Sequence, residues 1–258
     1  MSISVQLYTV RDAIADDLPG TMRRLAEIGF TQVEPYNFVA LADDLARAFA
    51  DTGLTAPTAH APLLSSDQDA IFEAARQLGI ATVIEPFVPA EHWQDEASIR
   101  EIATALNAAA KKAAAYGITV GYHNHWWELE SRVGGTSALE YFASLLDPDL
   151  VLEVDTYWAQ VGGEDPVALL TRLGSQVVAI HVKDDPRRVG VEPVDPTGEV
   201  VMGQVPAGQG VMDVPAVVAA PPALRYAVIE FDAYVGDLFA ALADSLAYVS
   251  ANTEAGAR

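Results

Sequence analysis

The stretch that decides the fold is Gly121-Tyr-His-Asn-His-Trp-Trp-Glu-Leu-Glu130, which continues the apolar run that begins at Ile118. Two of the chain's five histidines, His123 and His125, lie here two residues apart. Residues i and i+2 of a strand point to the same face, so a strand over 119–125 would project both imidazoles from one side. Glu128 follows in the loop just beyond. Two imidazoles and a carboxylate at the end of an apolar strand are suited to binding a metal ion or moving protons.

On both sides of this stretch, short β-branched runs alternate with longer amphipathic segments rich in Ala and Leu. The short runs predict strands over 2–8, 30–34, 55–60, 81–86, 118–125, 150–155, 177–183 and 226–231. The longer segments predict helices over 18–27, 41–51, 67–78, 97–116, 137–146, 165–173, 214–220 and 235–250. Glycines lie one or two residues after the ends of the first four helices, where they are the usual stop signal.

Eight strand–helix units in a chain of 258 residues predict an α/β fold, a single-domain (β/α)8 TIM barrel over residues 1–258, because that fold has a typical length of ~250 residues. A doubly wound open sheet is the alternative. It usually carries a glycine-rich turn after an early strand, whereas the first strand here ends in Leu7-Tyr-Thr-Val-Arg-Asp12. The segment 184–212 is too long for an ordinary turn and is interpreted either as a functional lid or as an insertion.

Composition excludes several classes of protein. The chain has no cysteine, which rules out disulfides, zinc–thiolate sites and cysteine nucleophiles. Its formal charge of −21, from 36 acidic and 15 basic residues, would repel a phosphate backbone and predicts no nucleic-acid partner. The N-terminal residues lack the basic region followed by an apolar run that is typical of a signal peptide. No stretch approaches the ~20 consecutive apolar residues that a membrane helix needs. We therefore expect a cytoplasmic protein with no membrane partner.

Ionisable residues gather at the predicted strand ends. Four of the five histidines lie there, and the full set is Glu34, His60, Glu85, His123, His125, Glu153, Asp155, His181, Lys183, Glu230 and Asp232. In a TIM barrel these ends carry the active site. Carboxylates that converge on one rim repel each other unless a cation lies among them. We therefore predict a divalent metal site that includes Asp155, His181 and Glu230, since a mixed imidazole and carboxylate set suits Mn, Fe, Co and Zn.

Three residues each have two possible interpretations. Glu34 and His60 are candidate substrate contacts, and equally they could be ordinary residues of the rim. Trp158 could form, with Trp126 and Trp127, a wall against which a sugar stacks. The alternative for this aromatic group is packing beneath the loops.

Taken together, these motifs resemble the sugar phosphate isomerase/epimerase family, which has a xylose isomerase-like TIM barrel. The residues that carry the resemblance, over nearly the whole chain, are Gln6-Leu-Tyr-Thr-Val-Arg-Asp12, Tyr122-His-Asn-His-Trp-Trp-Glu128, Glu153-Val-Asp155 with Tyr157-Trp158, His181-Val-Lys-Asp184, Gly208-Gln-Gly-Val-Met-Asp213 and Ile229-Glu-Phe231. The resemblance implies one divalent ion, often manganese, held by Glu, Asp, His and Glu. Asp155, His181 and Glu230 match three of these positions. His123 stands where the family has its first glutamate, so His123 and Glu128 are alternatives for the fourth ligand.

The resemblance also implies a metal-dependent isomerase or epimerase that acts on a sugar or polyol derivative through an enediolate-type intermediate. Manganese is the expected ion, with cobalt, zinc or magnesium as alternatives. His125 and Lys183 match positions that contact substrate or move protons, and Glu128 is a further candidate base.

Other functions compete with this one. The same intermediate could expel a hydroxyl, as in a dehydratase or lyase, and the chain could also be a non-catalytic sugar-binding barrel. A metal-dependent apurinic-site endonuclease is disfavoured by the acidic charge. The expected partner is a small carbohydrate without phosphate, because basic residues are scarce and scattered, with Arg187 and Arg188 adjacent in the long loop. A homodimer is one expectation for the assembly.

Overall fold

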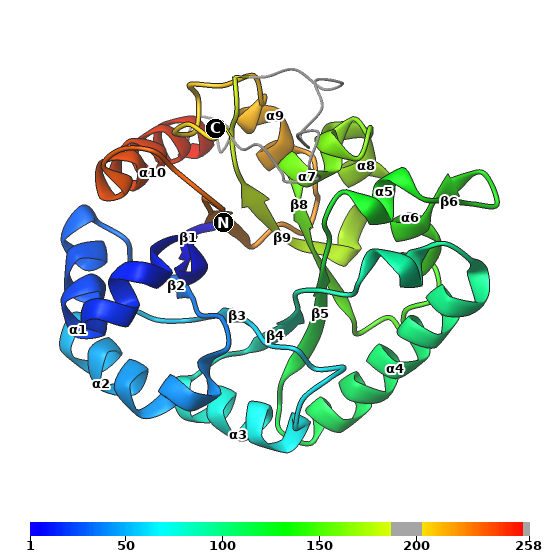
Figure 1. Cartoon of the computed structure of the whole chain (residues 1–258), viewed down its shortest axis with the longest axis horizontal. Helices are drawn as coiled ribbons and strands as arrows, with labels where there is room; N and C mark the ends of the chain where they lie inside the picture. The colour runs from blue at the N-terminus through cyan, green and yellow to red at the C-terminus, as the bar shows by residue number, and fades with distance from the viewer. Residues whose placement is uncertain (187–202, 255–258) are drawn as a thin grey trace.

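The computed structural model describes residues 1–186 and 203–254, and it shows eight parallel strands ringed by helices (Figure 1). The barrel strands are β1 (Ser2–Gln6), β2 (Val33–Glu34), β3 (Thr58–His60), β4 (Thr82–Glu85), β5 (Thr119–His123), β8 (Val151–Asp155), β9 (Val177–Val182) and β10 (Tyr226–Ile229). The helices that follow them are α1 (Arg11–Ile28), α2 (Ala42–Thr52), α3 (Gln68–Leu78), α4 (Glu96–Ala114), α6 (Ala138–Ala143), α8 (Pro166–Leu173), α9 (Val214–Ala219) and α10 (Leu238–Glu254). The predicted single-domain TIM barrel is confirmed.

The sheet runs in the order β2-β1-β10-β9-β8-β5-β4-β3. Its two ends meet through parallel pairings of Gln32 with Thr55 and of Tyr36 with His60. Backbone hydrogen bonds support this closure, with Val33 N donating to Thr55 O at 2.9 Å and His60 N donating to Pro35 O at 2.8 Å. Closure brings the C-terminal ends of all eight strands around one opening.

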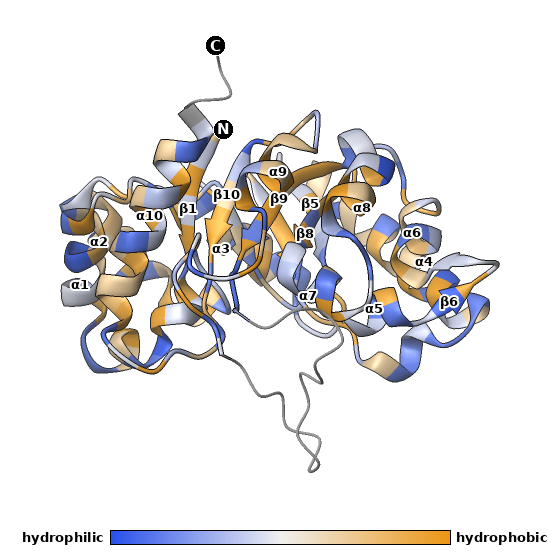
Figure 2. Cartoon of the chain, turned by 90° about the horizontal axis from the view of Figure 1, so that it is seen from above, coloured by the Kyte–Doolittle hydropathy of each residue, from blue (hydrophilic) through white to orange (hydrophobic). Residues whose placement is uncertain are grey.

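The strands are buried on both faces, as parallel strands covered by helices must be. All six residues of β9 are buried, and hydrophobic residues predominate on the central strands (Figure 2). Alternation along each strand separates the two faces. In β5, Tyr122 packs against Phe142 of α6 with ring centroids 4.9 Å apart, whereas His123 points into the barrel toward Glu153. Strand polarity therefore decides which side chains enter the site.

Several element boundaries differ from the prediction. Strand β5 ends at His123 rather than at 125, because the Asn124 side chain turns away to accept a hydrogen bond from Asp155 N at 3.0 Å. Helix α1 begins at Arg11, and Asp17 interrupts it with a φ of −153°. Asp17 Oδ1 accepts a hydrogen bond from Gly20 N, so the predicted helix over 18–27 is the second half of α1.

Two helices and a hairpin were not predicted. They are α5 (Trp127–Glu130), α7 (Thr156–Val161) and the pair β6 (Arg132–Val133) with β7 (Thr136–Ser137). Part of the predicted long loop, 187–202 with Arg187 and Arg188, lies outside the described residues. Among the helices of the described ranges, none has the length and apolar character needed to cross a membrane.

Candidate active site

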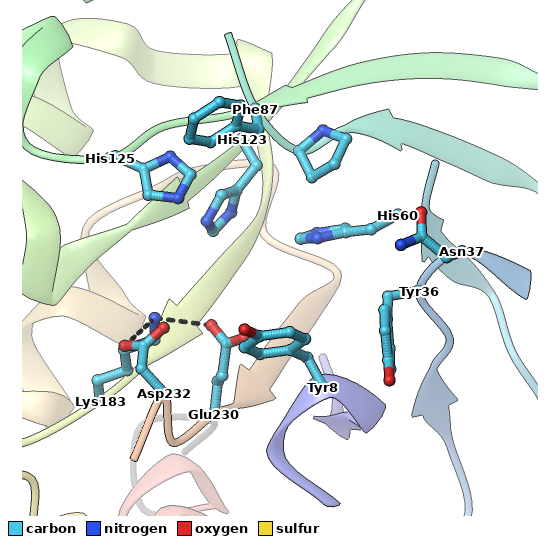
Figure 3. A pocket seen from close by; sticks show the side chains of 11 residues that line it. Tyr8, Tyr36, Asn37, His60, Phe87, His123, His125, Lys183, Glu230 and Asp232 are labelled. Atoms are coloured by element: carbon cyan, nitrogen blue, oxygen red, sulfur yellow. Dashed lines mark hydrogen bonds and ion pairs between the residues drawn. The ribbon is translucent and has the colours of Figure 1, made fainter. Parts of the chain in front are cut away.

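A pocket of about 360 Å³ opens at the C-terminal ends of the strands (Figure 3). Five residues singled out from the sequence line it, namely His60, His123, His125, Lys183 and Glu230. Six further lining residues had no assigned role, namely Tyr8, Tyr36, Asn37, Pro86, Phe87 and Asp232. Closure of the barrel is what brings these strand ends into one pocket.

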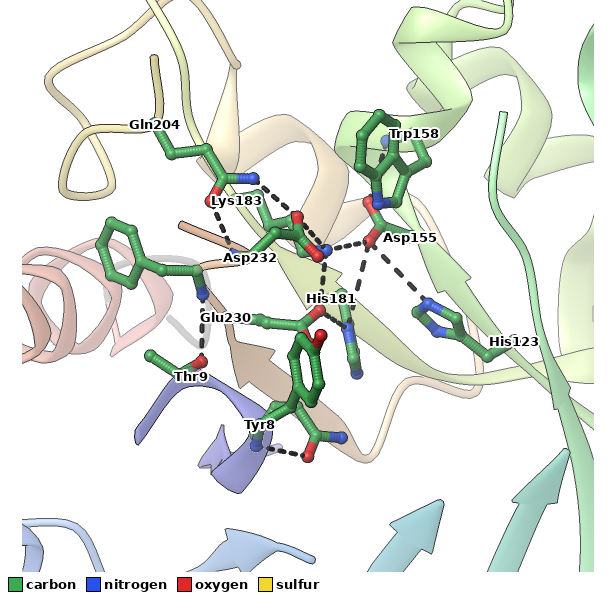
Figure 4. A network of polar contacts seen from close by, with 12 residues as sticks. Tyr8, Thr9, His123, Asp155, Trp158, His181, Lys183, Gln204, Glu230 and Asp232 are labelled. Atoms are coloured by element: carbon green, nitrogen blue, oxygen red, sulfur yellow. Dashed lines mark hydrogen bonds and ion pairs between the residues drawn. The ribbon is translucent and has the colours of Figure 1, made fainter. Parts of the chain in front are cut away.

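Lys183 lies at the centre of a group that we call the rim cluster, which it forms with Asp155, Glu230 and Asp232 (Figure 4). Its Nζ is 2.9 Å from Asp155 Oδ2, 2.7 Å from Glu230 Oε2 and 2.8 Å from Asp232 Oδ2. Burial alone would lower the pKa of Lys183, but the three carboxylates outweigh it and raise the pKa well above its usual range. These three carboxylates therefore favour the ammonium form of Lys183.

A second group, the deep cluster, lies next to the rim cluster and consists of Glu34, His60, His123, Glu153 and His181. Glu153 Oε2 is 2.6 Å from His60 Nε2, 3.1 Å from His123 Nδ1 and 3.0 Å from His181 Nε2. Glu34 Oε1 lies 3.0 Å from His181 Nε2 and 3.3 Å from His60 Nε2. All five side chains are buried. No lysine or arginine of the described chain forms an ion pair with Glu34 or Glu153, as Lys183 does with its own carboxylates.

Two histidines, His123 and His181, connect the two clusters. One ring nitrogen of each faces the deep cluster, and the other nitrogen faces the rim cluster. His181 Nδ1 lies 2.6 Å from Glu230 Oε2, opposite the nitrogen that faces Glu153. His123 Nε2 lies 3.9 Å from Asp155 Oδ2. This arrangement follows from the spacing of Glu153 and Asp155 on β8: residues two apart point the same way but at different depths of the barrel.

Burial and neighbouring charges shift the pKa values of residues in both clusters. Burial alone would lower the pKa of His181, but Glu153 and Glu230 outweigh it and raise the pKa well above its usual range. Burial, reinforced by the charge of Glu153, raises the pKa of Glu34. Burial also raises the pKa of Asp155, to about 6, despite the nearby Lys183. Buried carboxylates in these clusters are thus stabilised by a bound proton or by a neighbouring positive charge.

The donor atoms fit a divalent ion in two overlapping ways. Asp155, His181 and Glu230 offer ligand atoms that all lie within 4.8 Å of one another. His60, His123, Glu153 and His181 form a second such set. Glu34 Oε2 and Glu153 Oε1 are buried and have no hydrogen-bond partner among the described residues. Buried carboxylate oxygens without a partner are the kind of atom that a metal ion satisfies.

Glu128, predicted as a base or fourth ligand, is placed away from the pocket. Its Oε1 accepts a hydrogen bond from Tyr122 OH at 2.7 Å, and its Oε2 accepts one from His125 N at 3.0 Å. Tyr122 lies on the helix-facing side of β5, so the carboxyl group follows it there. Burial raises the pKa of Glu128 to about 8. In this arrangement Glu128 anchors the backbone of His125 and reaches neither the pocket nor the clusters.

His125, predicted to move protons, does line the pocket. Its ring stacks on Trp127 at 4.5 Å with an interplanar angle of 5° and meets Phe87 edge-on at 5.5 Å. Burial, together with the nearby His123 and Lys183, lowers the pKa of His125 well below its usual range. Its Nδ1 has no hydrogen-bond partner among the described residues. This environment favours the neutral form of the His125 imidazole.

The two predicted substrate contacts Glu34 and Trp158 do not line the pocket, unlike His60. Glu34 is fully buried in the deep cluster and accepts a hydrogen bond from Gln6 at 2.8 Å. Trp158 is buried against Trp126, with ring centroids 4.8 Å apart, so packing beneath the loops is the better interpretation of this ring. Glu34 and Trp158 are therefore buried behind the residues that line the pocket.

Exposed aromatic surface at the pocket comes instead from residues that sequence reasoning missed. Phe87 is 52% exposed and Tyr8 is 40% exposed. Tyr8 also packs edge-on against Tyr36 at 5.2 Å. Each of the three follows within two residues of a strand end, at β4, β1 and β2. Position after a strand was therefore the signal that could have identified them.

Residues 203–212, which follow the undescribed segment, are hydrogen-bonded to Asp184 and to Asp232 of the rim cluster. Asp184 accepts hydrogen bonds from the backbone N–H groups of Gly208, Gly210 and Met212, at 2.9, 3.0 and 3.0 Å. A Cβ at Gly210 would lie 2.0 Å from Asp184 Oδ1, so only glycine fits there. Gln204 Nε2 donates to Asp232 Oδ2 at 2.7 Å, and Asp232 N donates back to Gln204 Oε1 at 2.8 Å. The loop thereby orients one of the three carboxylates around Lys183.

Known proteins share this architecture. An inosose dehydratase of Clostridium beijerinckii is 27% identical over 100 residues, which cover 38% of this chain and 33% of that protein. The alignment thus spans about a third of that relative's length. A solved sugar phosphate isomerase/epimerase of Parabacteroides distasonis is 22% identical with a TM-score of 0.77, covering 96% of this chain and 92% of its own. The IOLI protein, solved with a zinc atom, is 14% identical with a TM-score of 0.67, covering 98% and 96%.

These likenesses agree with the resemblance found in the sequence motifs. At such identities the two solved structures support the fold, while the relatives' own names span isomerases or epimerases and a dehydratase. The model of one family matches residues 22–227, most of the barrel. The chain belongs to the xylose isomerase-like TIM barrel family.

Proposed function

We propose that this protein is a metal-dependent enzyme that moves a proton at a carbon next to the carbonyl group of a sugar or polyol derivative. An isomerase or epimerase working through an enediolate-type intermediate is the first candidate. The observation that carries the proposal is that an imidazole, an amine and a carboxylate, the side chains of His125, Lys183 and Glu230, line one pocket. Groups of these kinds can move a proton beside a carbonyl and stabilise the charge that develops there.

A divalent ion fits this chemistry. His181 would hold it, together either with Asp155 and Glu230 or with His60, His123 and Glu153. When bound, the ion would act as a Lewis acid that polarises the substrate carbonyl. A mixed nitrogen and oxygen donor set suits manganese, cobalt or zinc better than magnesium, which prefers oxygen ligands.

His125 is our candidate for the group that takes the proton from carbon. Imidazole is the side chain most often used as a general base near neutral pH, and the side chain of His125 lines the pocket. Stacking on Trp127 and the hydrogen bond from His125 N to Glu128 hold the ring and its backbone in place. Glu230, which also lines the pocket, is the alternative base.

The pocket favours a carbohydrate without phosphate. Lys183 is the one lysine or arginine among the described lining residues, and three carboxylates already surround it. Glu230 and Asp232 would repel a phosphate dianion. The exposed faces of Phe87 and Tyr8 offer apolar surface of the kind against which sugar rings pack.

A dehydratase is the second candidate, supported by the partial similarity to an inosose dehydratase. The same loss of a proton beside a carbonyl initiates both reactions, and they differ in whether a β-hydroxyl then leaves. Product analysis separates the two: isomerisation conserves mass, whereas dehydration removes one water molecule.

The test is solvent deuterium exchange into a panel of keto-sugars and inososes with Mn²⁺ present, followed by NMR. We expect deuterium at the carbon next to the carbonyl for at least one substrate. His125→Gln should reduce this rate by roughly 10²–10⁴-fold, as expected when general base catalysis is lost. His92→Gln, an exposed histidine outside the pocket, is the matched control.

Two outcomes would contradict the proposal. Exchange that is unaffected by His125→Gln and by Glu230→Gln would remove both candidate bases. Binding of sugars without any exchange, with each metal tried, would instead indicate a non-catalytic sugar-binding barrel.

A further inference from the structure

Asn37 is the only residue other than glycine in the described chain whose backbone has a positive φ angle, at 43°. It lies between Tyr36, which pairs with His60 where the barrel closes, and Phe38, which is fully buried. Its backbone N–H donates to His60 O at 3.1 Å. The chain must therefore turn sharply at this position, into a conformation that glycine adopts without strain and asparagine at a modest cost.

The side chain of Asn37 contributes little to the fold. Asn37 precedes a short 3-10 helix, Phe38–Leu41, but its side chain does not cap that helix. It forms no side-chain hydrogen bond within residues 1–186 and 203–254. It lines the pocket instead, next to Tyr36, whose hydroxyl also has no hydrogen-bond partner in this part of the chain. A carboxamide and a hydroxyl group are thus available to a ligand on this wall of the pocket.

Asn37 lies across the pocket from the groups proposed to move the proton. Strands β2 and β8 are opposite each other in the closed ring, because equal numbers of strands separate them on either side. Asn37 follows β2, whereas His125 and Lys183 follow β5 and β9, the two neighbours of β8. Figure 3 shows Tyr36 and Asn37 on one side of the pocket and His125 and Lys183 on the other. A substrate whose carbonyl lies near His125 and Lys183 therefore turns its remote end toward Asn37.

The chemistry of this wall suits a hydroxyl group. A carboxamide has two N–H donors and one carbonyl acceptor and carries no charge, so it can both donate to a hydroxyl and accept from one. Phosphate and carboxylate groups are usually bound by arginine or lysine. Neither type is among the lining residues of this wall, which are Tyr8, Tyr36, Asn37 and His60. The pocket volume of about 360 Å³ is near the lower end of the range for ligand sites, which suits a single sugar unit.

We propose that Asn37 determines substrate specificity by binding a free hydroxyl group at the end of the substrate remote from the carbonyl. This inference rests on the proposed function for the position of the carbonyl. It adds that the remote end of the substrate bears a hydroxyl group without phosphate.

The test measures the binding of sugars that differ in one hydroxyl group, by ligand-observed NMR with the full chain and Mn²⁺. The probes are D-xylulose, D-fructose and a keto-inositol, each paired with the analogue that lacks the hydroxyl group farthest from its carbonyl. For at least one pair, we expect the wild type to bind the hydroxylated sugar about 10-fold more tightly, the factor that one net hydrogen bond provides. Asn37→Gly should bind both members of that pair equally. The phosphate ester of D-fructose at its terminal hydroxyl should bind no more tightly than D-fructose.

Two further variants separate recognition from a role in the backbone. Asn37→Gly should melt within about 3 °C of the wild type, because glycine adopts the left-handed conformation freely. Asn37→Ala should also lose the preference, but it should melt lower, because its Cβ is strained at positive φ. Ala40→Gly, an exposed position of the same 3-10 helix outside the pocket, is the matched control and should keep the preference.

A preference that persists in Asn37→Gly would overturn the inference, as would tighter binding of the phosphate ester. A wild type that binds both members of every pair equally, or binds none of these sugars, would overturn it as well. These measurements do not require turnover. A preference that depends on Asn37 without deuterium exchange in any sugar would refute the proposed function and leave Asn37 as a residue of sugar recognition. Exchange at equal rates in both members of each pair would do the reverse.

Discussion

The rim cluster and the deep cluster hold neighbouring carboxylates by different means. In the rim cluster, three carboxylates share the single ammonium group of Lys183. In the deep cluster, the polar partners of Glu34 and Glu153 within the described part of the chain are imidazoles and one amide. Asp155 and Glu153 are two residues apart on the same strand. Two residues along one strand therefore separate a carboxylate paired with an ammonium group from a carboxylate paired with imidazoles.

A buried carboxylate outside both clusters has neither an ammonium group nor imidazoles as hydrogen-bond partners. Glu85, at the end of β4, accepts backbone hydrogen bonds from Leu64 N at 2.8 Å and from Phe87 N at 3.3 Å. Burial outweighs these bonds and raises the pKa of Glu85 to about 7. Backbone donors alone are therefore weaker compensation than an ammonium ion, and each of the following variants tests one part of this contrast.

The largest effect is expected for Lys183→Met, which leaves the carboxylates of the rim cluster without their cation. We expect the free energy of unfolding to fall by about 3–5 kcal/mol, the usual cost of removing one partner from a buried ion pair. Urea denaturation at pH 7.5 with a chelator present measures it. In the exposed pair of Lys111 with Asp147, 3.3 Å apart, Lys111→Met should cost less than about 1 kcal/mol. A loss at Lys183 no larger than in this control would mean that the rim cluster does not depend on its ammonium group.

The next effect concerns Glu85 and the dependence of stability on pH. Because its folded pKa of about 7 lies above the ordinary value of 4.5, the folded state binds this proton more tightly than the unfolded state. Stability from this group is complete below pH 4.5 and is lost as the pH rises toward 7. The contribution is on the order of 3 kcal/mol.

Glu85→Gln removes this titration, so the difference in unfolding free energy between wild type and variant should change across pH 4.5–7 and level off above it. Urea denaturation at several pH values measures that difference. Glu73→Gln, on the exposed face of α3, controls for the loss of one carboxyl group. A constant difference between wild type and Glu85→Gln over this range would show that Glu85 is already ionised at pH 5.

The smallest effect is expected for Gln204→Ala, which removes the loop's two hydrogen bonds to Asp232. Each such bond contributes about 1 kcal/mol, so we expect a loss of about 1–2 kcal/mol in unfolding free energy. Cobalt binding should stay within twofold of wild type, because Gln204 is hydrogen-bonded to Asp232, which is not among the candidate metal ligands. Gln209→Ala, an exposed position in the same loop, is the control. A strong loss of cobalt affinity in Gln204→Ala would show that the metal site depends on the orientation of Asp232.

Much of this barrel could be predicted from local pattern. Gly29, Gly53, Gly79 and Gly117 do follow helical segments, and the strand ends do carry the ionisable residues of the site. Short helices such as α5 and α7 were missed, because four to six residues show too little of a helical period. Phe87 and Tyr8 were missed for a different reason, since neither carries the carboxylate, imidazole or amine that marked the other residues at the strand ends.

The sequence by itself determined the fold, the end of the barrel at which the polar residues gather and the identity of most of them, because these follow from the periods of strands and helices. Only the tertiary structure decided which atoms meet. Glu128 follows Tyr122 to the outer side of β5, and Lys183 enters between Asp155 and Glu230. Such contacts join strands far apart in the chain and depend on the depth and rotation of each side chain, which a one-dimensional pattern does not encode.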